Sequence, residues 1–313
     1  MPHCNYFGAL LTGLLLSRAL LPLQAQDAAA YEQKQDLVYG EVHGTGLLMD
    51  VFTPTARTNG LAVVDVVSGA WHSDRGKIRD HNLAQIYTIL CRHGYAVFAV
   101  RPGSITRYTA AEMTQNLKTG IRWVKDRANA YHIDPTRLGL TGASAGAHLA
   151  LLAAATPEDG QPNAKTSAAR QDTRVKAVAV FFPPTDFLDW DGKPALTEVV
   201  GRLLFVGGAT GHSDDEVRRL AEAASPARVL KQTTLPFLIF HGDADPLVPL
   251  QQSRRMVEAI KAAGGSAELI VKPGGGHPWL TIPEEVETMA KWFDRTLSGD
   301  SATPAANPAP ANR

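Results

Sequence analysis

The chain has 313 residues, with 31 Lys and Arg against 31 Asp and Glu, so its formal net charge is zero when His is neutral. A balanced charge gives no electrostatic reason to expect nucleic acid or an anionic membrane surface as a partner, and we predict neither. The content of 44% hydrophobic and 20% charged residues is that of an ordinary globular protein, long enough for one large α/β domain or two small ones. The oligomeric state is not predictable from these numbers.

The N-terminal segment predicts export. Residues 6–23 are mostly apolar with Arg18 as their only charge, and small residues follow at Ala25 and at 28–30. This pattern is typical of a signal peptide, residues 1–25, cleaved between residues 25 and 30, and it places the mature protein in the periplasm or outside the cell. Because little positive charge precedes the apolar run, an uncleaved anchor is the alternative. A lipoprotein is disfavoured, since Cys4 precedes the run.

Cleavage leaves Cys91 as the only cysteine, so no disulfide is expected within the mature domain. Its neighbours at helical spacing are apolar, namely Leu83, Ile86, Tyr87 and Leu90. We therefore expect Cys91 to be a packed core residue and not a reactive thiol.

The next segment predicts a β-hairpin, because two apolar-rich runs, 36–42 and 47–52, flank the turn residues 43–46. Short apolar runs of the kind buried in parallel sheets then recur along the chain. They lie at 61–67, 95–100, 138–141, 175–181, 235–240 and 267–271.

Helical periods separate most of these runs. One spans 109–128 and begins with a capping box, Thr109-x-x-Glu112, and another covers 286–297. Alternating strands and helices predict an α/β fold with a doubly wound, mostly parallel sheet, opened by the antiparallel hairpin. A single domain over residues 31–297 accounts for the pattern.

Residues 183–231 depart from this alternation because they contain no obvious strand. They include an apolar helical stripe from Leu196 to Leu204 and a second capping box, Ser213-x-x-Glu216. We predict a small cap insertion that covers the site, and a crossover helix pair packed on the sheet is the alternative. Residues 298–313 are rich in Ala, Pro and Asn without a large apolar residue, which predicts a disordered tail.

The segment Gly142-Ala143-Ser144-Ala145-Gly146 follows one predicted strand and precedes an Ala- and Leu-rich helix. A nucleophile elbow needs this context, because the tight turn tolerates only small flanking residues and lifts the Ser hydroxyl above the sheet edge. The turn also leaves the Ala145 N–H at a helix N-terminus, where an oxyanion is stabilised. We therefore predict Ser144 as a nucleophile.

A Ser hydroxyl needs a neighbouring base, and His277 is the best candidate among ten His. It follows three Gly just beyond the strand predicted at 267–271, at a strand end where doubly wound folds build their sites. The preceding loop supplies the acid that would orient it. Asp245 is preferred there over Asp243, for which we expect hydrogen bonds to loop N–H groups in an Asx turn, and His241 is predicted to close the same loop. The order Ser, Asp, His is that of α/β-hydrolases.

These motifs resemble those of α/β-hydrolase serine esterases related to bacterial feruloyl and acetyl esterases, the BD-FAE-like proteins. The residues that carry the resemblance are 142–146, Ile133-Asp134-Pro135-x-Arg137, His241-Gly242-x-x-Asp245-x-x-Val248-Pro249 and Gly276-His277, and the similarity covers about residues 36–297. It implies the same catalytic residues: Ser144, Asp245 and His277.

One motif departs from the family pattern. Such esterases often carry His-Gly-Gly-Gly-Trp after an early strand, whereas this chain has Val67-Ser68-Gly69-Ala70-Trp71. Backbone N–H groups form an oxyanion hole, so Gly69 and Ala70 are predicted donors beside Ala145. Without the leading His, another residue must hold this loop in shape.

Three tryptophans, Trp71, Trp190 and Trp279, lie on loops expected to border the site and are candidate surfaces for a sugar or an aryl group, with ordinary packing as the alternative. We find no His-Glu-x-x-His, no Cys pair and no phosphate-binding Gly loop followed by Lys, so neither metal nor other cofactor is predicted.

The leading hypothesis is a carboxylic ester hydrolase that works through an acyl-enzyme on a small-molecule or carbohydrate ester with a short or aryl acyl group. A prolyl oligopeptidase-like peptidase is the runner-up, although 313 residues leave no room for the propeller that such enzymes usually carry. A non-catalytic binding protein that keeps the fold is a third alternative. Against the short-acyl preference, the stripe from Leu196 to Leu204 has the character of a lipase lid.

Overall fold

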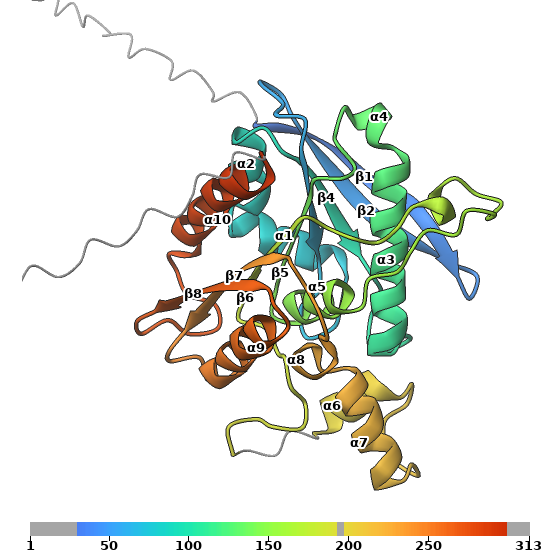
Figure 1. Ribbon diagram of the computed structural model, residues 1–313, viewed down its shortest axis with the longest axis vertical. Coiled ribbons are helices and arrows are strands. Elements are labelled where there is room, and N and C mark those ends of the chain that lie inside the picture. The colour runs from blue at the N-terminus through green and yellow to red at the C-terminus, as the bar shows by residue number, and fades with distance from the viewer. Residues whose placement is uncertain (1–29, 193–196, 299–313) are drawn as a thin grey trace, which may run out of the picture.

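A computed structural model describes residues 30–192 and 197–298 of the chain. The predicted signal peptide lies outside these residues, as does the predicted tail beyond residue 298. One sheet runs through the centre of the molecule in the strand order β1-β2-β4-β3-β5-β6-β7-β8 (Figure 1). The strands are β1 (Tyr31–Val42), β2 (Thr45–Pro54), β3 (Ala62–Val66), β4 (Ala96–Arg101), β5 (Leu138–Ala143), β6 (Ala177–Phe181), β7 (Pro236–Gly242) and β8 (Ser266–Lys272).

The predicted hairpin opens the sheet. β1 and β2 pair antiparallel, and the two-residue turn between them has positive φ at both His43 (52°) and Gly44 (67°). Such a turn matches the right-handed twist of the flanking strands. β2 also pairs antiparallel with β4, whereas the pairs from β4 through β3, β5, β6 and β7 to β8 are all parallel. The predicted fold class is confirmed.

Helices cover both faces of the sheet (Figure 1). One face packs against α3 (Ala110–Asp126), α5 (Ala145–Ala155) and α9 (Leu250–Ala262), and the other against α1 (Arg75–Leu83), α2 (Ile86–Arg92) and α10 (Ile282–Leu297). The remaining helices are α4 (Ala128–Tyr131), a 3₁₀ turn (Ala168–Arg170), α6 (Glu198–Leu204), α7 (Asp214–Ala223) and α8 (Pro226–Val229). The predicted capping box of α3 is present, with the Thr109 hydroxyl accepting from the Glu112 N–H and the Glu112 carboxylate accepting from the Thr109 N–H.

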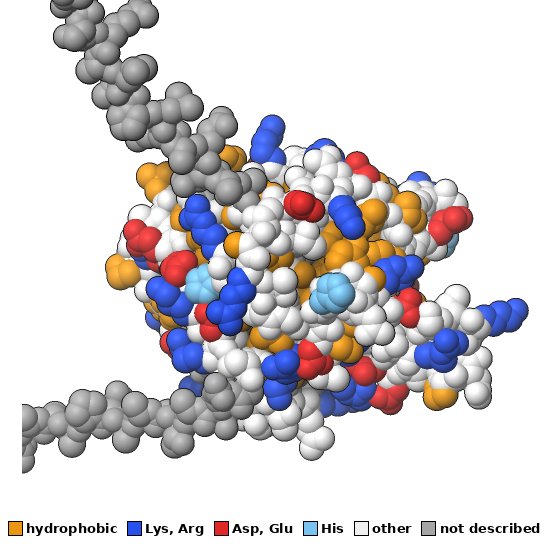
Figure 2. Space-filling view, turned by 90° about the horizontal axis from the view of Figure 1, so that it is seen from above, with side chains coloured by type: hydrophobic (Ala, Val, Ile, Leu, Met, Phe, Trp, Pro, Cys, Tyr) orange, Lys and Arg blue, Asp and Glu red, His pale blue; other side chains and the backbone are white. Residues whose placement is uncertain are grey.

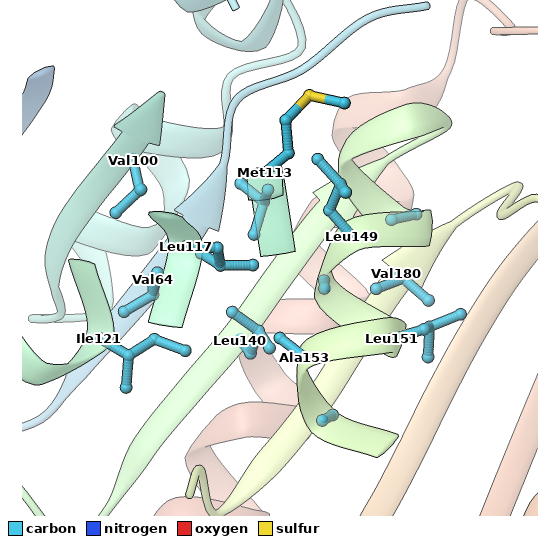
Figure 3. Close-up of a cluster of buried hydrophobic side chains, with 14 of the residues drawn as sticks. Val64, Val100, Met113, Leu117, Ile121, Leu140, Leu149, Leu151, Ala153 and Val180 are labelled. Atoms are coloured by element: carbon cyan, nitrogen blue, oxygen red, sulfur yellow. The ribbon is translucent and has the colours of Figure 1, made fainter. Parts of the chain in front are cut away.

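The alternation of side chains along each strand divides the core into two layers. On β3, Val64 packs into the layer beneath α3 and α5, whereas Val63 packs into the layer beneath α2 and α10. Figure 3 shows the first layer, where Leu117 and Ile121 of α3 and Leu149 of α5 meet side chains of the sheet. Both faces of the central strands are therefore buried, which is why these strands are mostly apolar runs in the sequence, with Asp65 of β3 as a charged exception.

The helical stripe around Cys91 was predicted correctly except at one residue. Ile86, Tyr87 and Leu90 are buried with Cys91, but the side chain of Leu83 is 73% exposed. The stripe spans two helices, because Gln85 between α1 and α2 takes a left-handed conformation at φ 60° and turns the chain. Burial raises the pKa of the Cys91 thiol to about 12, so the thiol stays protonated.

Candidate active site

Ser144 lies on a sharp turn between β5 and α5. Its backbone angles, φ 52° and ψ −119°, fall in a region that non-glycine residues rarely adopt. The neighbouring backbones are so close that a Cβ on Gly146 would lie 2.2 Å from the Val66 carbonyl oxygen, and one on Gly142 would lie 2.7 Å from the Gly146 carbonyl carbon. The two glycines permit the strained turn, which projects the Ser144 hydroxyl into a cavity.

His277 reaches Ser144 from the loop after β8. The Ser144 hydroxyl donates a hydrogen bond to His277 Nε2 at 2.9 Å. The imidazole ring is largely buried, and the Phe182 ring packs against it with the ring centres 4.3 Å apart. The imidazole is therefore held where it can take a proton from the hydroxyl.

Asp245 completes the arrangement from the loop after β7. Its Oδ2 accepts a hydrogen bond from His277 Nδ1 at 2.6 Å, and its Oδ1 accepts from the N–H groups of Leu247 (2.8 Å) and Val248 (2.9 Å). Burial by itself raises the pKa of Asp245, but hydrogen bonds from His241, His277 and the Val248 N–H hold it well below its usual range. The carboxylate is therefore ionised and fixes which imidazole nitrogen carries the proton.

The competing acid, Asp243, lies on the same loop and plays a different part. Its Oδ1 accepts from the Gly274 N–H at 2.6 Å and so fastens the loop that carries His277. The Asx turn predicted for it is wrong, because Asp245 makes that turn. His241 closes the loop as predicted, donating from Nε2 to the Val248 carbonyl oxygen at 2.8 Å.

The loop predicted to form the oxyanion hole, residues 67–71 and here called the oxyanion loop, offers one donor fewer than predicted. The Gly69 N–H already donates to the His72 carbonyl oxygen at 2.9 Å, so it is not free to bind an oxyanion. The N–H groups of Ala70 and Ala145 donate to no other described residue. Ala70 follows Gly69 in the loop that borders Ser144, and Ala145 is the first residue of α5. These two groups are the remaining candidate donors.

Hydrogen bonds to α5 and a neighbouring loop hold the oxyanion loop in place of the absent His. The Trp71 indole donates to Nδ1 of the buried His148 at 3.0 Å, and His148 Nε2 donates to the Ala224 carbonyl oxygen at 2.7 Å. The Gly146 N–H donates to the Ser68 carbonyl oxygen at 3.1 Å, and the Ile105 N–H to that of Trp71 at 2.8 Å. These bonds support a strained loop, since Ala70 and Trp71 both have positive φ, 47° and 57°.

Ser144 and His277 open onto a cavity of about 990 Å³ with a mainly apolar lining. The three predicted tryptophans all contribute to it. Trp71 is also a core residue, packed against Phe187, which in turn stacks on Trp190. Trp279 packs edge-on against Phe182 and donates its indole N–H to Glu285 at 2.9 Å. The tryptophans therefore offer ring surfaces, while the indole N–H groups of Trp71 and Trp279 are already used.

The described residues of 183–231, which we call the covering segment, border this cavity, and Asp186 anchors them to α9. Pro184, Phe187 and Trp190 line it, with Thr197, Val199 and Val200 at the start of α6. The fully buried Asp186 pairs with Arg228 Nε at 2.6 Å and with Arg255 Nε at 2.7 Å. Of the predicted stripe, Val200, Leu203 and Leu204 are buried and Val199 is exposed, while Leu196 lies outside the described residues.

A polar corner from α1 interrupts the apolar lining and was not predicted. Lys77, Asp80 and His81 line the cavity there, and Lys77 pairs with Asp80 at 3.1 Å. His81 Nδ1 pairs with the fully buried Asp65 of β3 at 2.7 Å. Burial alone lowers the pKa of His81, but the Asp65 carboxylate raises it above its usual value.

One face of the surface carries mixed charge, and the described residues contain neither a helix that could span a membrane nor a cluster that could hold a metal ion. On the face in Figure 2, basic and acidic side chains are interspersed, and neither sign gathers over a broad area. Within residues 30–192 and 197–298, no helix has the length and apolar character needed to cross a membrane. In the same ranges, no three His, Cys, Asp or Glu side chains are grouped so as to hold a metal ion.

Comparisons with known proteins agree with this architecture. The chain is 29% identical over 236 residues to the probable carboxylic ester hydrolase LipM of Mycobacterium tuberculosis, covering 74% of this chain and 52% of LipM. It is 29% identical over 245 residues to the esterase LipQ of the same organism, covering 75% and 54%. The chain thus spans about half the length of these curated relatives.

Solved structures show the same fold. A truncated carbohydrate esterase from gut microbiota superposes with a TM-score of 0.72 at 24% identity, covering 86% of this chain and 98% of that one. An acetyl ester-xyloside bifunctional hydrolase from Caldicellulosiruptor lactoaceticus superposes with a TM-score of 0.69 at 19% identity, covering 83% and 95%. The family profile described as BD-FAE matches residues 49–260, more than half of the chain. The protein therefore belongs to the BD-FAE family of α/β-hydrolase fold proteins.

Proposed function

We propose that this protein is a carboxylic ester hydrolase that works through Ser144, His277 and Asp245. The observation that carries the proposal is the continuous hydrogen-bond chain from the Ser144 hydroxyl to His277 Nε2 and from His277 Nδ1 to the buried Asp245 carboxylate. These hydrogen-bonded residues lie at the edge of a cavity large enough for an organic ester. The esterase names of the relatives LipM and LipQ support the same reaction class.

In the acylation step, Ser144 Oγ attacks the carbonyl carbon of the ester while His277 Nε2 takes the hydroxyl proton. The carbonyl oxygen becomes an oxyanion, which the N–H groups of Ala70 and Ala145 stabilise. The intermediate collapses as the carbon–oxygen bond to the alcohol breaks, and His277 gives its proton to the leaving oxygen. Asp245 stabilises the imidazolium throughout this step.

In the deacylation step, His277 takes a proton from water as the water oxygen attacks the acyl carbon. The second tetrahedral intermediate expels Ser144 Oγ, which recovers its proton from the imidazolium. The products are a carboxylic acid, an alcohol and the free enzyme. All proton transfers therefore pass through His277, without any cofactor in these steps.

For the acyl group, we propose a short chain, such as acetyl, or a compact aryl group of the feruloyl type. The aromatic rings of the cavity support an aryl group. A carbohydrate is one candidate for the alcohol, because two structural neighbours are a carbohydrate esterase and an acetyl ester-xyloside bifunctional hydrolase, and the lining of the cavity has to be weighed against it. The predicted export is compatible with such substrates and would be tested by sequencing the N-terminus of the mature protein.

Hydrolysis of p-nitrophenyl acetate by the wild type and by Ser144→Ala tests the proposal. Loss of the nucleophile is expected to lower kcat by about a millionfold while the protein stays folded. Ser266→Ala, an exposed serine at the start of β8, is the matched control and keeps full activity. A fluorophosphonate probe is expected to label the wild type and not Ser144→Ala. Ester turnover that survives Ser144→Ala at wild-type rate would reject the assignment.

Peptide hydrolysis is a second candidate function, favoured by one observation. The chain is 24% identical over 239 residues to the uncharacterized peptidase YuxL of Bacillus subtilis, covering 69% of this chain and 32% of YuxL. A prolyl peptide anilide in the same assay separates the two functions. An esterase is expected to cleave the acetate far faster than the anilide, and the reverse ranking would favour a peptidase.

A further inference from the structure

Exposed apolar side chains are concentrated at the mouth of the active-site cavity. Among the described residues, six large apolar side chains are exposed, and four of them line this cavity: Leu83, Val199, Leu247 and Leu280. Single exposed apolar residues are ordinary, whereas a cluster around one cavity marks a binding surface. We call these four residues the apolar rim.

The proton transfer from His277 decides which part of an ester lies against Leu247 and Leu280, the rim residues next to His277 and Asp245 in the sequence. His277 gives its proton to the leaving alcohol oxygen, so the alcohol must lie against the loops that carry His277 and Asp245. Leu247 follows Asp245 by two residues, and Leu280 follows His277 by three. Their side chains are 63% and 101% exposed, so both are free to contact a ligand.

The wall on this side of the cavity is apolar throughout. The lining residues that these two loops and the start of α10 contribute, apart from His277 itself, are Leu247, Val248, Pro278, Trp279, Leu280, Ile282 and Pro283. The indole N–H of Trp279 is already bonded to Glu285. The polar side chains Lys77, Asp80 and His81 come from α1, a separate segment of the lining. This wall therefore offers no unused polar side chain to the hydroxyl groups of a sugar.

We propose that the leaving group of the natural substrate is a bulky apolar alcohol, aryl or alicyclic, which binds between Phe182, Trp279 and the leucines of the rim. This inference rests on the proposed ester hydrolysis and specifies its alcohol. Burial of each additional ring carbon against the wall favours the transition state, because the alcohol is still attached when the intermediate forms.

The test holds the acyl group constant and enlarges the alcohol. Phenyl, 2-naphthyl and 4-biphenylyl acetates release phenols of similar acidity, so differences in kcat/KM report binding of the ring system. We expect kcat/KM to rise by at least tenfold from the phenyl to the biphenylyl ester. In the double variant Leu247→Gln/Leu280→Gln, this ratio is expected to fall to about 2. If the double variant folds poorly, Leu280→Gln alone serves as the test, because this position is wholly exposed. We expect it to give a ratio between those of the wild type and the double variant.

Val38→Gln is the matched control. Val38 is 60% exposed on β1 and does not line the cavity, so this variant keeps the wild-type ratio. Equal kcat/KM for the three acetates, or a tenfold rise that persists in Leu247→Gln/Leu280→Gln, would overturn the proposal.

Two further arms assign the rim to the correct part of the substrate. If the double variant lowers the ratio for phenyl octanoate over phenyl acetate and leaves the biphenylyl ratio intact, the rim binds acyl chains and the proposal is wrong. Faster hydrolysis of acetylated xylan than of biphenylyl acetate would equally overturn it. A wild type without Ser144-dependent turnover of phenyl acetate would instead reject the ester hydrolase assignment itself, which is a distinct result.

Discussion

The Trp71 indole N–H donates its hydrogen bond to His148, a residue of α5 that lies about one helical turn beyond Ser144 at the start of that helix. The oxyanion loop and the nucleophile are thereby fastened to the same helix. Trp71→Phe removes this bond and leaves a buried imidazole nitrogen without a donor. We expect kcat for p-nitrophenyl acetate to fall by about tenfold with little change in KM, because the oxyanion donors act on the transition state.

The matched pair for this prediction is His148→Asn against His148→Leu. An Asn side chain can accept from Trp71 and donate to the Ala224 carbonyl, whereas Leu can do neither. Asn is therefore expected to retain most of the activity that Leu loses. Equal activity in the two variants would show that the hydrogen bonds of His148 do not matter for catalysis.

Acid is expected to destabilise the fold through His148. Burial lowers the pKa of His148 to about 4 from its ordinary 6.5, although the bond to Ala224 opposes this shift. Between these pH values the unfolded chain binds a proton that the folded protein does not. The stabilising contribution is therefore complete above pH 6.5 and is lost as the pH falls toward 4, by on the order of 3 kcal/mol.

Urea unfolding at pH 7 and at pH 4 measures this loss, with His148→Asn as the reference because Asn does not titrate. We expect the wild type to lose more stability than the variant between the two pH values. A loss of the same size in both proteins would assign the acid sensitivity to other groups.

The two acids on the loop after β7 are expected to differ sharply in their effect on turnover. Asp245→Asn removes the charge that stabilises the His277 imidazolium and disturbs its tautomer, so kcat is expected to fall by about 10⁴-fold. Asp243→Asn keeps an oxygen that can accept from the Gly274 N–H, so we expect a decrease below about tenfold. The kinetics of the two variants on p-nitrophenyl acetate measure this. The reverse ranking would transfer the role to Asp243.

The close approach of backbones at the elbow predicts a strong effect of one methyl group. Gly146→Ala places a Cβ 2.2 Å from the Val66 carbonyl oxygen, where only backbone movement can relieve the clash. We expect a loss of about 3 kcal/mol or more in urea unfolding. Gly46→Ala is the control, because its Cβ would lie 3.8 Å from its nearest neighbour in the hairpin. A change below about 1 kcal/mol for Gly146→Ala would contradict the predicted strain.

The sequence was most informative where burial leaves a simple pattern. Each central strand is mostly apolar and is buried on both faces, so runs such as 61–67 and 138–141 predicted β3 and β5 closely. The candidate site was predictable from two features. The elbow glycines could be recognised because a tight turn restricts residue type, and the order of Ser144, Asp245 and His277 is that of α/β-hydrolases. The same pattern failed at Leu83, where a left-handed residue ends the helix, and helical spacing does not reveal such a break.

Other features depend on backbone pairing within a loop or on contacts between distant segments, and they could not be predicted. The Gly69 N–H is used by a local bridge to His72, and His148 meets Trp71 across 77 positions of the sequence. A charged residue inside the apolar run of β3, Asp65, was the one signal in the sequence for the buried pair with His81. The position of the covering segment depends on Asp186 and its two arginine partners, which lie 42 and 69 positions away.

The burial of Asp186 has a consequence for how substrates enter. Moving residues 184–190 away from α9 would separate its carboxylate from Arg228 and Arg255 and leave an uncompensated charge, at a cost of several kcal/mol. The same motion would pull Phe187 from its packing against Trp71 and His148. This part of the covering segment thus behaves as a fixed wall and not as a hinged lid. On the proposed function, esters would then be selected by fit to a preformed shape, with rates that follow dissolved monomer concentration and show no jump at an oil–water boundary.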